Sequence, residues 1–256
     1  MISHARKVAL VTGAAKRIGR VIALTLAKRG WDIVVHYNHS VDDARVTVRD
    51  IETLGRRAVM VQCELSDEKA VSALLPAAAQ AIGTTISCVV NNASLFEYDN
   101  DADFSQARLD AHMHTNLAAP LLLARALYDS TPESAQSVVV NLLDQKLFNL
   151  NPDFLSYTLS KAALHTATVM LAQALAPQVR VVGVASGITM VSGDQSEQAF
   201  VNAHTKTPLG RSSTPDDVAA TVCFVVENPA ITGTTLLVDG GQHLIPLQRD
   251  VMFTAK

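Results

Sequence analysis

The sequence predicts one doubly wound α/β domain, with about seven parallel strands and helices on both faces of the sheet. Short runs rich in valine, isoleucine and leucine alternate with longer helical stretches through the 256 residues, and this rhythm is typical of repeated βαβ units. The short runs are apolar at every position, as expected for parallel strands that are covered on both faces. We find no repeat or linker that would divide the sequence, so residues 1–256 are expected to form a single domain.

Each element is placed by the pattern of its own residues. Seven apolar runs are expected to be strands: residues 8–11, 32–36, 58–62, 88–90, 138–143, 179–184 and 235–238. Six stretches with helical spacing lie between them: residues 18–29, 42–54, 68–81, 107–128, 157–175 and 215–226. Gly30 is expected to end the first helix, and Thr214 followed by Pro215 gives an N-cap with proline at the first helical position. Residues 186–207 form the least regular connection, which we interpret as a lid over the substrate site.

Composition and charge narrow the functional class. Hydrophobic residues make up 48% and the formal net charge is -3, so the sequence lacks the basic field of a protein that binds nucleic acid or an anionic membrane surface. No apolar run reaches the ~18 residues of a membrane span. Cys63, Cys88 and Cys223 are far apart, which indicates free thiols in a reducing compartment, so a cytoplasmic protein is expected. His112 and His114 point to different faces of a predicted helix, and no metal site is expected.

A glycine-containing loop follows the first predicted strand. It reads TGAAKRIGR from Thr12 to Arg20 and opens a helix. Gly13 can make the tight turn and Gly19 can let the helix pack closely on the strand, while the helix N-terminus presents N–H groups to a phosphate. Strand, loop and helix in this order are typical of a Rossmann-type dinucleotide site. The loop carries Arg17 where a pattern of the type TGxxxGxG would have glycine.

The end of the second strand indicates which dinucleotide binds. An NAD-binding domain usually has Asp or Glu there, which accepts a hydrogen bond from the ribose 2′-hydroxyl and repels a 2′-phosphate. Here no acid occurs before Asp42. Basic and hydroxyl side chains can hold a dianionic 2′-phosphate by charge-assisted hydrogen bonds, so we predict NADPH or NADP as the cofactor. The residues expected to hold this phosphate are Lys16, Arg17, His36, His39 and Ser40.

Tyr157 and Lys161 form a candidate catalytic pair. They lie four positions apart on a predicted helix, and side chains at this spacing share one face. A nearby ammonium stabilises a phenolate, so Lys161 is expected to lower the pKa of Tyr157 from about 10 towards a value that suits an acid at neutral pH. Asn116 lies in another helical stretch. With the dinucleotide loop, these residues indicate a reductase.

On these residues the sequence resembles the short-chain dehydrogenase/reductase family along nearly its whole length. The likeness covers the TGxxxxxG loop, Asn91-Asn92-Ala93, Asn116, Tyr157 with Lys161, and Gly233 with Val238-Asp239-Gly240-Gly241. The resemblance implies that Tyr157 donates a proton, that Lys161 binds ribose hydroxyls and tunes the tyrosine, and that Asn116 holds a water molecule of a proton relay. It also implies a homotetramer built through the helices near residues 117–127 and 162–176.

Asp144 departs from the general pattern of this family. Members that reduce ketones usually have serine thirteen positions before the tyrosine, and this sequence has Asp144 there. A carboxylate repels a carbonyl oxygen that gains negative charge, but it suits a ring nitrogen that gains a proton. Asp144 therefore points to reduction of a C=N bond, and its alternative interpretation is a structural cap or a partner of Lys146.

A second departure follows the Asn91-Asn92-Ala93 motif, where Ser94 replaces a common glycine and Phe96 could stack a flat heterocycle against the nicotinamide. With TGAAKRIGR and HYNHS, these features resemble the pteridine reductase branch and the related dihydromonapterin reductases. The resemblance implies a pterin pocket of Arg17, Ser94, Phe96, Asp144 and Tyr157. It implies that the cofactor contacts Gly13, Lys16, Arg17, Ile18, Gly19, His36, Tyr37, Asn38, His39, Ser40, Glu64, Leu65, Asn92, Ala93, Lys161, Gly187 and Thr189.

The function predicted from these residues is NADPH-dependent reduction of a pterin or dihydropterin. The expected partner is thus a small heterocyclic substrate, and neither nucleic acid nor a membrane. One alternative is a carbonyl reductase acting on a ketone such as a 3-oxoacyl thioester, which Asp144 and Ser94 argue against. The other is a regulatory protein that binds NADP without catalysis, and the intact set of Asn116, Tyr157 and Lys161 argues against it.

Overall fold

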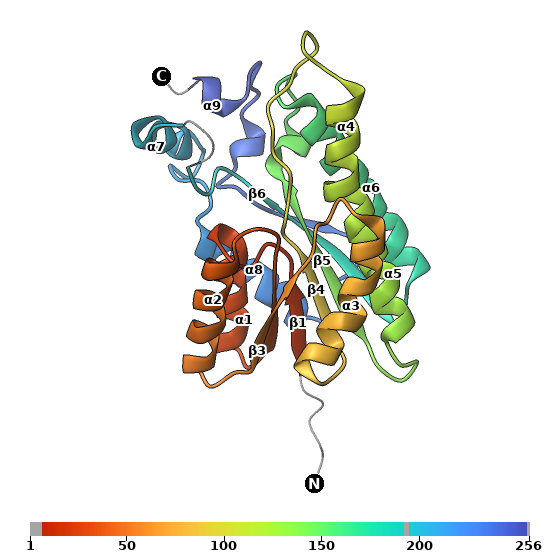
Figure 1. The fold of residues 1–256 in the computed structure, drawn as a ribbon. Helices are drawn as coiled ribbons and strands as arrows, with labels where there is room; N and C mark the ends of the chain where they lie inside the picture. Colours follow the sequence, from red (N-terminus) through yellow and green to blue (C-terminus); the bar gives the residue numbers. More distant parts are fainter. Residues whose placement is uncertain (1–6, 192–194, 255–256) are drawn as a thin grey trace.

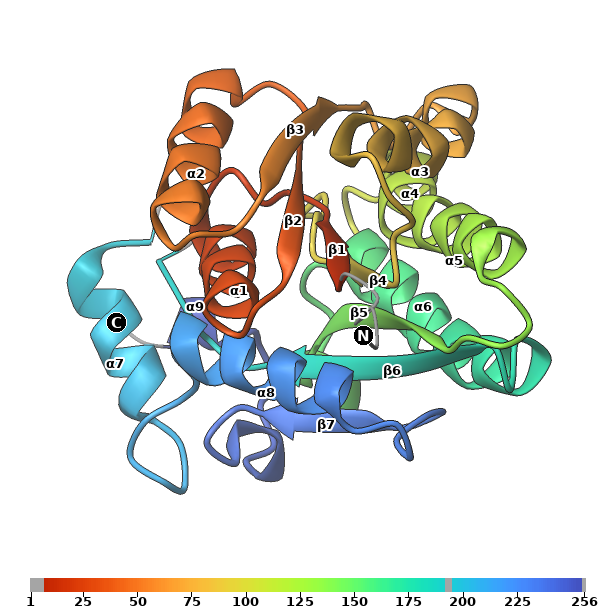
Figure 2. The same ribbon diagram turned by 90° about the horizontal axis from the view of Figure 1, so that it is seen from below.

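The computed structural model of the protein, which describes residues 7–191 and 195–254, contains a seven-stranded sheet in the order β3-β2-β1-β4-β5-β6-β7 (Figure 2). All neighbouring strands are parallel. The strand order reverses between β1 and β4, as in doubly wound folds, so the predicted fold class is confirmed. The strands are β1 (Val8–Val11), β2 (Asp32–Tyr37), β3 (Ala58–Gln62), β4 (Cys88–Asn91), β5 (Ser137–Asp144), β6 (Val179–Ser186) and β7 (Thr235–Val238).

Helices cover both faces of the sheet (Figure 1). One face carries α1 (Arg17–Lys28), α2 (Val41–Thr53) and α8 (Pro215–Glu227), and the other carries α3 (Glu68–Ile82), α5 (Ala119–Ser130) and α6 (Leu155–Ala174). α7 (Glu197–Thr205) and α9 (Val251–Thr254) lie beyond the carboxyl ends of the strands, at the top of Figure 1. The remaining elements are α4 (Gln106–Met113), the π-helical turn η1 (His114–Ala118), and the 3₁₀ turns η2 (Gln145–Phe148) and η3 (Gln242–Leu244).

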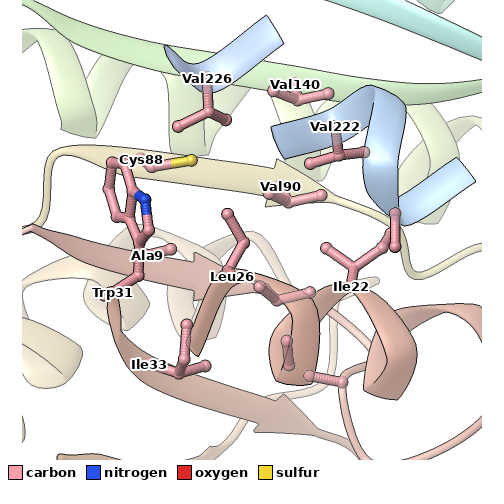
Figure 3. Close-up of a cluster of buried hydrophobic side chains, with 14 of the residues drawn as sticks. Ala9, Ile22, Leu26, Trp31, Ile33, Cys88, Val90, Val140, Val222 and Val226 are labelled. Carbon is pink, nitrogen blue, oxygen red and sulfur yellow. The ribbon is translucent and has the colours of Figure 1, made fainter. Parts of the chain in front are cut away.

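The strands are buried because their side chains alternate between two apolar layers. Ala9 and Val90 face α1 and α8, and Leu26 of α1 packs over them (Figure 3). Leu10 and Val89 belong to the second layer, under α3 and α5. All five side chains are fully buried, and burial of each larger one stabilises the fold by about 1.5–3 kcal/mol. This double burial explains why the strands are apolar at every position.

Two regions differ from the sequence-based expectation. The single helix expected over residues 107–128 consists of α4, η1 and α5, because the chain widens into a π-helical turn at His114–Ala118. Residues 186–207, expected to be an irregular lid, contain α7, which Ser196 caps by accepting a hydrogen bond from the Ala199 N–H at 3.2 Å. Residues 192–194 of that expected lid lie outside the described residues.

The predicted boundaries of α1 and α8 agree with the structure. Gly30 follows α1 with a φ of +91°, as expected for a glycine after a helix C-terminus. The Thr214 hydroxyl accepts a hydrogen bond from the Asp217 N–H at 3.2 Å, and the Asp217 carboxylate accepts one from the Thr214 N–H at 2.9 Å. This reciprocal pair is a capping box, and it fixes the start of the helix that packs on α1.

The three thiols are free and buried. Burial raises the pKa of Cys63 to about 11, that of Cys88 to about 12 and that of Cys223 to about 11. The thiols are therefore protonated at neutral pH and unreactive in the folded protein. Within residues 7–191 and 195–254, no helix is both long and apolar enough to span a membrane. The same residues bring together no metal-ligating group of three side chains.

Candidate active site

Polar residues gather at the carboxyl ends of β1, β4, β5 and β6, where two clefts meet. A groove of about 530 Å³ lies between the loop after β1 and the loop after β4. A pocket of about 190 Å³ lies between the ends of β5 and β6 and the segment around α9. Arg17, Ile18, Phe96 and Tyr157 line both clefts. A ligand in the groove would therefore lie beside a ligand in the pocket.

The loop after β1 is fixed to the loop after β4 by a threonine hydroxyl. Thr12 Oγ1 accepts hydrogen bonds from the N–H groups of Asn92 at 2.9 Å and Ala93 at 3.0 Å. Gly13 has a φ of +63°, which glycine adopts without strain. A Cβ on Gly19 would lie 2.3 Å from the Gly13 carbonyl oxygen. The predicted tight turn and close helix approach are therefore both present.

His36 does not lie where a phosphate could reach it, so the expected phosphate contact is wrong. The residue is 1% exposed. Its Nδ1 accepts a hydrogen bond from the Gly13 N–H at 3.0 Å, and its Nε2 lies 3.0 Å from the Cys63 carbonyl oxygen. These partners require a neutral ring with its proton on Nε2, and burial lowers the pKa of His36 to about 4. His36 therefore braces the phosphate loop from below.

The side chains of Lys16 and Arg17 point in different directions. Lys16 Nζ forms an ion pair of 2.9 Å with Asp43 of α2, beside the end of β2. Arg17 Nη2 donates a hydrogen bond of 2.8 Å to the carbonyl of Val191, beyond the end of β6. Arg17 has a φ of +53°, a conformation that costs a non-glycine residue about 1–2 kcal/mol. The residue that replaces the expected glycine thus keeps the glycine backbone conformation and places a guanidinium between the two clefts.

Asn38 joins the ends of β2 and β3. Its amide donates a hydrogen bond to the Glu64 carboxylate, which also accepts one from the Ser66 N–H at 3.1 Å. These hydrogen bonds, that of the Ser66 N–H first, hold the pKa of Glu64 below its usual range. Glu64 is therefore an ionised acceptor beside the carboxyl ends of β2 and β3.

The other predicted residues near β2 and β3 divide into two kinds. His39 is exposed, and Ser40 is partly exposed just before α2, so both are accessible to a ligand. Tyr37 packs against one apolar core and Leu65 is buried in the other.

Asn116 is 1% exposed in the π-helical turn η1. Its Nδ2 donates to the Leu95 carbonyl at 2.9 Å and to Ser160 Oγ at 3.0 Å. Its Oδ1 accepts from the Leu95 N–H at 2.8 Å and from Ser94 Oγ at 3.2 Å. The amide thereby makes two donor and two acceptor contacts. Its side chain therefore holds the loop after β4 against α6. Because the amide is occupied, the role in a proton relay expected for Asn116 would involve its backbone, and this role stays a prediction.

Asp144 and Tyr157 meet at the pocket. β5 ends at Asp144, and α6 begins two residues before Tyr157. The Tyr157 hydroxyl donates a hydrogen bond of 3.0 Å to Asp144 Oδ2, and Asp144 Oδ1 accepts one of 2.8 Å from the Lys146 N–H. The two interpretations of Asp144 thus describe two oxygens of one carboxyl group: one caps η2, and the other faces the tyrosine.

The tyrosine pKa differs from the sequence-based expectation. Burial raises the pKa of Tyr157 well above its usual value, and the charge of Asp144 raises it further. Lys161 Nζ is 5.9 Å from the centroid of the Tyr157 ring and donates a hydrogen bond of 2.8 Å to the Leu142 carbonyl. The expected lowering of the Tyr157 pKa is therefore wrong. The Asp144 carboxylate is hydrogen-bonded to the phenol, and the Lys161 ammonium is not. Burial lowers the pKa of Lys161 to about 8 and raises that of Asp144.

Aromatic rings form one wall of the pocket. Phe96 stacks on Phe154 with 4.5 Å between ring centroids and meets Tyr157 edge-on at 4.7 Å. Phe96 is still 41% exposed, so one ring face remains available to a ligand. Of the predicted pterin-site residues, Arg17, Phe96, Asp144 and Tyr157 line the pocket, and Ser94 lines the adjoining groove.

Gly187 and Thr189 form the opposite wall, after β6. The Gly187 N–H donates a hydrogen bond of 3.0 Å to the Val238 carbonyl, and the Thr189 hydroxyl donates one of 2.9 Å to the Gly187 carbonyl. These contacts tie the wall to β7. Both residues therefore line the pocket, and the contact with the cofactor expected for them stays a prediction.

Sequence reasoning missed Asp250 of the pocket and a buried acid next to the site, Asp99, and it did not place Lys146 in the pocket. Asp99 is fully buried and accepts hydrogen bonds from the N–H and hydroxyl of Ser156, so its negative charge lies at the N-terminus of α6, where a helix favours it. Lys146 and Asp250 line the pocket. Lys146 lies only two positions from Asp144 and was considered as its partner, whereas no spacing rule singles out Asp99 or Asp250.

Comparisons with known proteins show which reductases the chain is similar to. Residues 13–243 match the family described as enoyl-(acyl carrier protein) reductase. The FolM alternative dihydrofolate reductase 1 of Brucella canis, in complex with NADP, is 39% identical with a TM-score of 0.91, covering 96% of this chain and 97% of that chain. An uncharacterized oxidoreductase of Methylorubrum extorquens is 32% identical over 92% of this chain and 97% of its own length. The 3-oxoacyl-[acyl-carrier-protein] reductase FabG of Staphylococcus aureus is 29% identical over 93% and 98%.

We predict that Gly19→Ala weakens binding of NADPH by roughly tenfold or more. The added Cβ would lie 2.3 Å from the Gly13 carbonyl oxygen and 2.5 Å from Asn92 Nδ2, so the loop has to open. Fluorescence titration with NADPH measures the effect. Gly55→Ala is the control, because its Cβ would meet open space after α2 and only its φ of +74° would strain alanine. Equal affinities in the two variants would contradict the role given to Gly19.

His36 is predicted to make stability depend on pH. Its folded pKa of about 4 lies below the unfolded value of about 6.5, so the unfolded chain binds the proton more tightly and stability falls as pH decreases through this range. The loss amounts to about 2 kcal/mol between pH 7 and pH 5. Urea unfolding of wild type and His36→Gln at both pH values measures it, and the variant should lack this component. An identical pH dependence in the two proteins would refute the assignment.

Proposed function

Because the chain belongs to the short-chain dehydrogenase/reductase family and is an NADPH-dependent reductase of it, we propose that it reduces a C=N bond of a pterin or dihydropterin. One observation carries this proposal: the carboxyl group of Asp144 is hydrogen-bonded to the Tyr157 hydroxyl at 3.0 Å in the pocket. The likeness to a FolM alternative dihydrofolate reductase at 39% identity supports the same substrate class.

Asp144 influences the choice of substrate through its charge. When a C=O bond is reduced, its oxygen gains negative charge, and a carboxyl group that ionises beside it would oppose the reaction. When a C=N bond is reduced, the nitrogen gains a proton and needs a donor. A partly buried carboxyl with a raised pKa keeps its proton to higher pH than an ordinary aspartate, which suits a proton donor. Asp144 therefore favours a substrate with a ring nitrogen.

The groove fits a dinucleotide. Gly13 and Gly19 leave out side chains where two backbone segments approach most closely, and the first residues of the twelve-residue helix α1 line the groove, as a phosphate site requires. In bound NADPH, Lys16, His39 and Ser40 would hold the 2′-phosphate, and Lys161 would hold ribose hydroxyls. The cofactor supplies the hydride that the ring carbon of the substrate receives.

Tyr157 and Asp144 hold and move the proton. The raised pKa of Tyr157 keeps its phenol protonated, and the raised pKa of Asp144 favours the neutral carboxyl. Once the phenol has given its proton to the ring nitrogen, the phenol oxygen can accept the proton of the Asp144 carboxyl, and the direction of the hydrogen bond between the two residues reverses. The buried ammonium of Lys161 stabilises the phenolate character that develops meanwhile.

Phe96 supports a flat substrate. Its ring lies beside Tyr157 and keeps an exposed face, and offset stacking on such a face suits a bicyclic heterocycle. The guanidinium of Arg17 lines the pocket from the side of the phosphate loop. Together they would hold the heterocycle against the nicotinamide.

The second candidate function is reduction of a carbonyl group, for example in a 3-oxoacyl thioester. The 29% identity to a FabG reductase favours it, and so does the family description that names an enoyl-(acyl carrier protein) reductase. Asp144 in place of a serine opposes carbonyl reduction, because an ionised carboxylate repels the oxygen that gains negative charge.

A homotetramer fits the surface of α6. Leu159, Val169 and Met170 are exposed large apolar residues on this helix, at 46%, 41% and 63%. Apolar side chains grouped on one element are typical of an interface between protein chains. This assembly is part of the proposal, and sedimentation of the purified protein measures it.

We predict that the purified protein oxidises NADPH, followed at 340 nm, when dihydromonapterin or dihydrobiopterin is supplied. Asp144→Asn should lower kcat by roughly a hundredfold or more because an amide donates no proton, while NADPH affinity stays within twofold. Asp129→Asn, the same change in an exposed ion pair of α5, is the control. Turnover of acetoacetyl thioester alone, with a gain in Asp144→Ser, would replace this function by the second candidate.

Lys16 is predicted to select the phosphorylated cofactor. Lys16→Met should lower the preference for NADPH over NADH by roughly tenfold, the effect of one charge-assisted hydrogen bond. Arg17→Met should weaken both cofactors alike and raise KM for the substrate, because Arg17 reaches towards Val191 and not towards α2. Dissociation constants of both cofactors for the two variants test this, and the reverse pattern would mean that Arg17 holds the 2′-phosphate.

A further inference from the structure

A buried lysine joins two carboxyl groups at the base of the pocket. Lys146 is 3% exposed. Its backbone N–H donates a hydrogen bond of 2.8 Å to Asp144 Oδ1, and its ammonium forms an ion pair of 2.9 Å with Asp250 Oδ2. The ammonium also donates to Asn151 Oδ1 and lies 5.5 Å from the centroid of the Phe154 ring. One residue thus holds Asp144 by its main chain and Asp250 by its side chain.

Asp250 belongs to a C-terminal arm, which we define as residues 245–254. Arg249 of the arm forms two hydrogen bonds of 2.8 Å with the carboxylate of Asp153, and the Asp250 N–H donates to the same carboxylate at 2.7 Å. Phe253 packs against Tyr98 with 5.3 Å between ring centroids. The arm is therefore anchored on both sides of Asp250, and Asp250 itself lines the pocket.

The balance of charge around Asp144 follows from these contacts. Of the two carboxyl groups, Asp250 is in direct contact with the buried ammonium, and Asp144 is bonded to the backbone N–H of the same residue. If both carboxyl groups were ionised, one negative charge would lack a neutralising partner in a buried site, which is costly. The proton that removes this charge resides on the carboxyl group without the ammonium, and that group is Asp144.

Within residues 7–191 and 195–254, the other charged groups around the pocket have direct partners of their own, and the charge of Asp144 also acts on Lys161, whose pKa it raises. From α6, Tyr157 donates its hydroxyl proton to Asp144, and the ammonium of Lys161 donates to the Leu142 carbonyl. From α1, Arg17 lines the pocket and donates to the Val191 carbonyl. Arg249 and Asp153 neutralise each other on the outer side of the arm.

We propose that Lys146 is a positioning residue that holds the Asp250 carboxylate near Asp144, where the charge of Asp250 favours the protonated form of Asp144, so that the C-terminal arm sets the pH range in which the enzyme can deliver its proton. The inference deepens the proposed function and rests on it for the use of the proton, although the pair itself is independent of the substrate. Burial raises the pKa of Asp144 most and the charge of Asp250 raises it further, whereas the Lys146 N–H, the Tyr157 hydroxyl and the charge of Lys146 lower it.

The test compares wild type, Asp250→Asn and Asp250→Glu as full-length proteins with NADP bound. Carbon-13 NMR of protein labelled at aspartate carboxyl groups follows the titration of Asp144, whose signal is assigned by its absence in Asp144→Asn. Asp250→Asn leaves the ammonium of Lys146 available to Asp144, so the midpoint of Asp144 should fall by about one pH unit. Asp250→Glu keeps the charge and should restore the midpoint. Asp129→Asn on α5 is the control and should leave it unchanged.

Catalysis gives a second readout. The protonated form of Asp144 is the active one, so kcat/KM should decline as pH rises through its pKa. In Asp250→Asn this decline should move to lower pH by the same amount as the NMR midpoint. An Asp144 midpoint that does not move in Asp250→Asn overturns the inference, whatever the substrate is. A shifted midpoint in a protein that turns over no pterin refutes the proposed substrate and leaves the pair intact.

Arg249→Gln keeps the inference testable if Asp250→Asn fails to fold. This variant removes the outer anchor of the arm at Asp153 and retains every group in contact with Asp144. A looser arm weakens the contact between Asp250 and Lys146, so the Asp144 midpoint should move in the same direction by a smaller amount. A shift to higher pH, or none, in a folded Arg249→Gln protein overturns the proposal.

Discussion

In a parallel sheet all strands end at the same edge, and this constraint assembles the whole site. β1 leads into the phosphate loop, β4 into the loop that carries Asn92, β5 ends in Asp144 and β6 leads to Gly187. These segments are far apart in the sequence and meet because burial of both sheet faces fixes the register of the strands. The hydrophobic core therefore determines where each polar group stands, and replacement of a core residue would be felt at the reacting atoms.

The second principle of the site is the exclusion of water from paired groups. The Tyr157 hydroxyl, the Asp144 carboxyl and the Lys161 ammonium lie within one poorly hydrated region, so each of their pKa values is displaced in the direction that disfavours charge. Such groups exchange protons with a ligand at little reorganisation cost. The same exclusion makes the environment of Asp144 sensitive to one more charge, even a charge on a segment distant in the sequence.

Periodicity located the seven strands because their residues are apolar on both faces, and the spacing of Tyr157 and Lys161 placed both on one helix. The departure at Asp144 was also readable, since it depends on local distance along the chain. The direction in which a side chain points at the end of a strand could not be predicted from the sequence. His36 points into the fold and makes two hydrogen bonds there. The direction of the Tyr157 pKa shift was missed for a similar reason, because the Asp144 carboxyl that meets the hydroxyl comes from β5 and Tyr157 lies on α6. Tertiary contacts, and not local patterns, set both.

The buried thiols have a practical consequence. Cys63 follows β3 and packs in the apolar layer under α3 and α5, whereas Cys88 of β4 and Cys223 of α8 both pack in the layer under α1 and α8. Alkylating reagents attack thiolates, and these thiols stay protonated and covered while the fold is intact. Each cysteine therefore serves as a natural reporter of local opening, and the rate at which each is alkylated would map which layer of the molecule separates first.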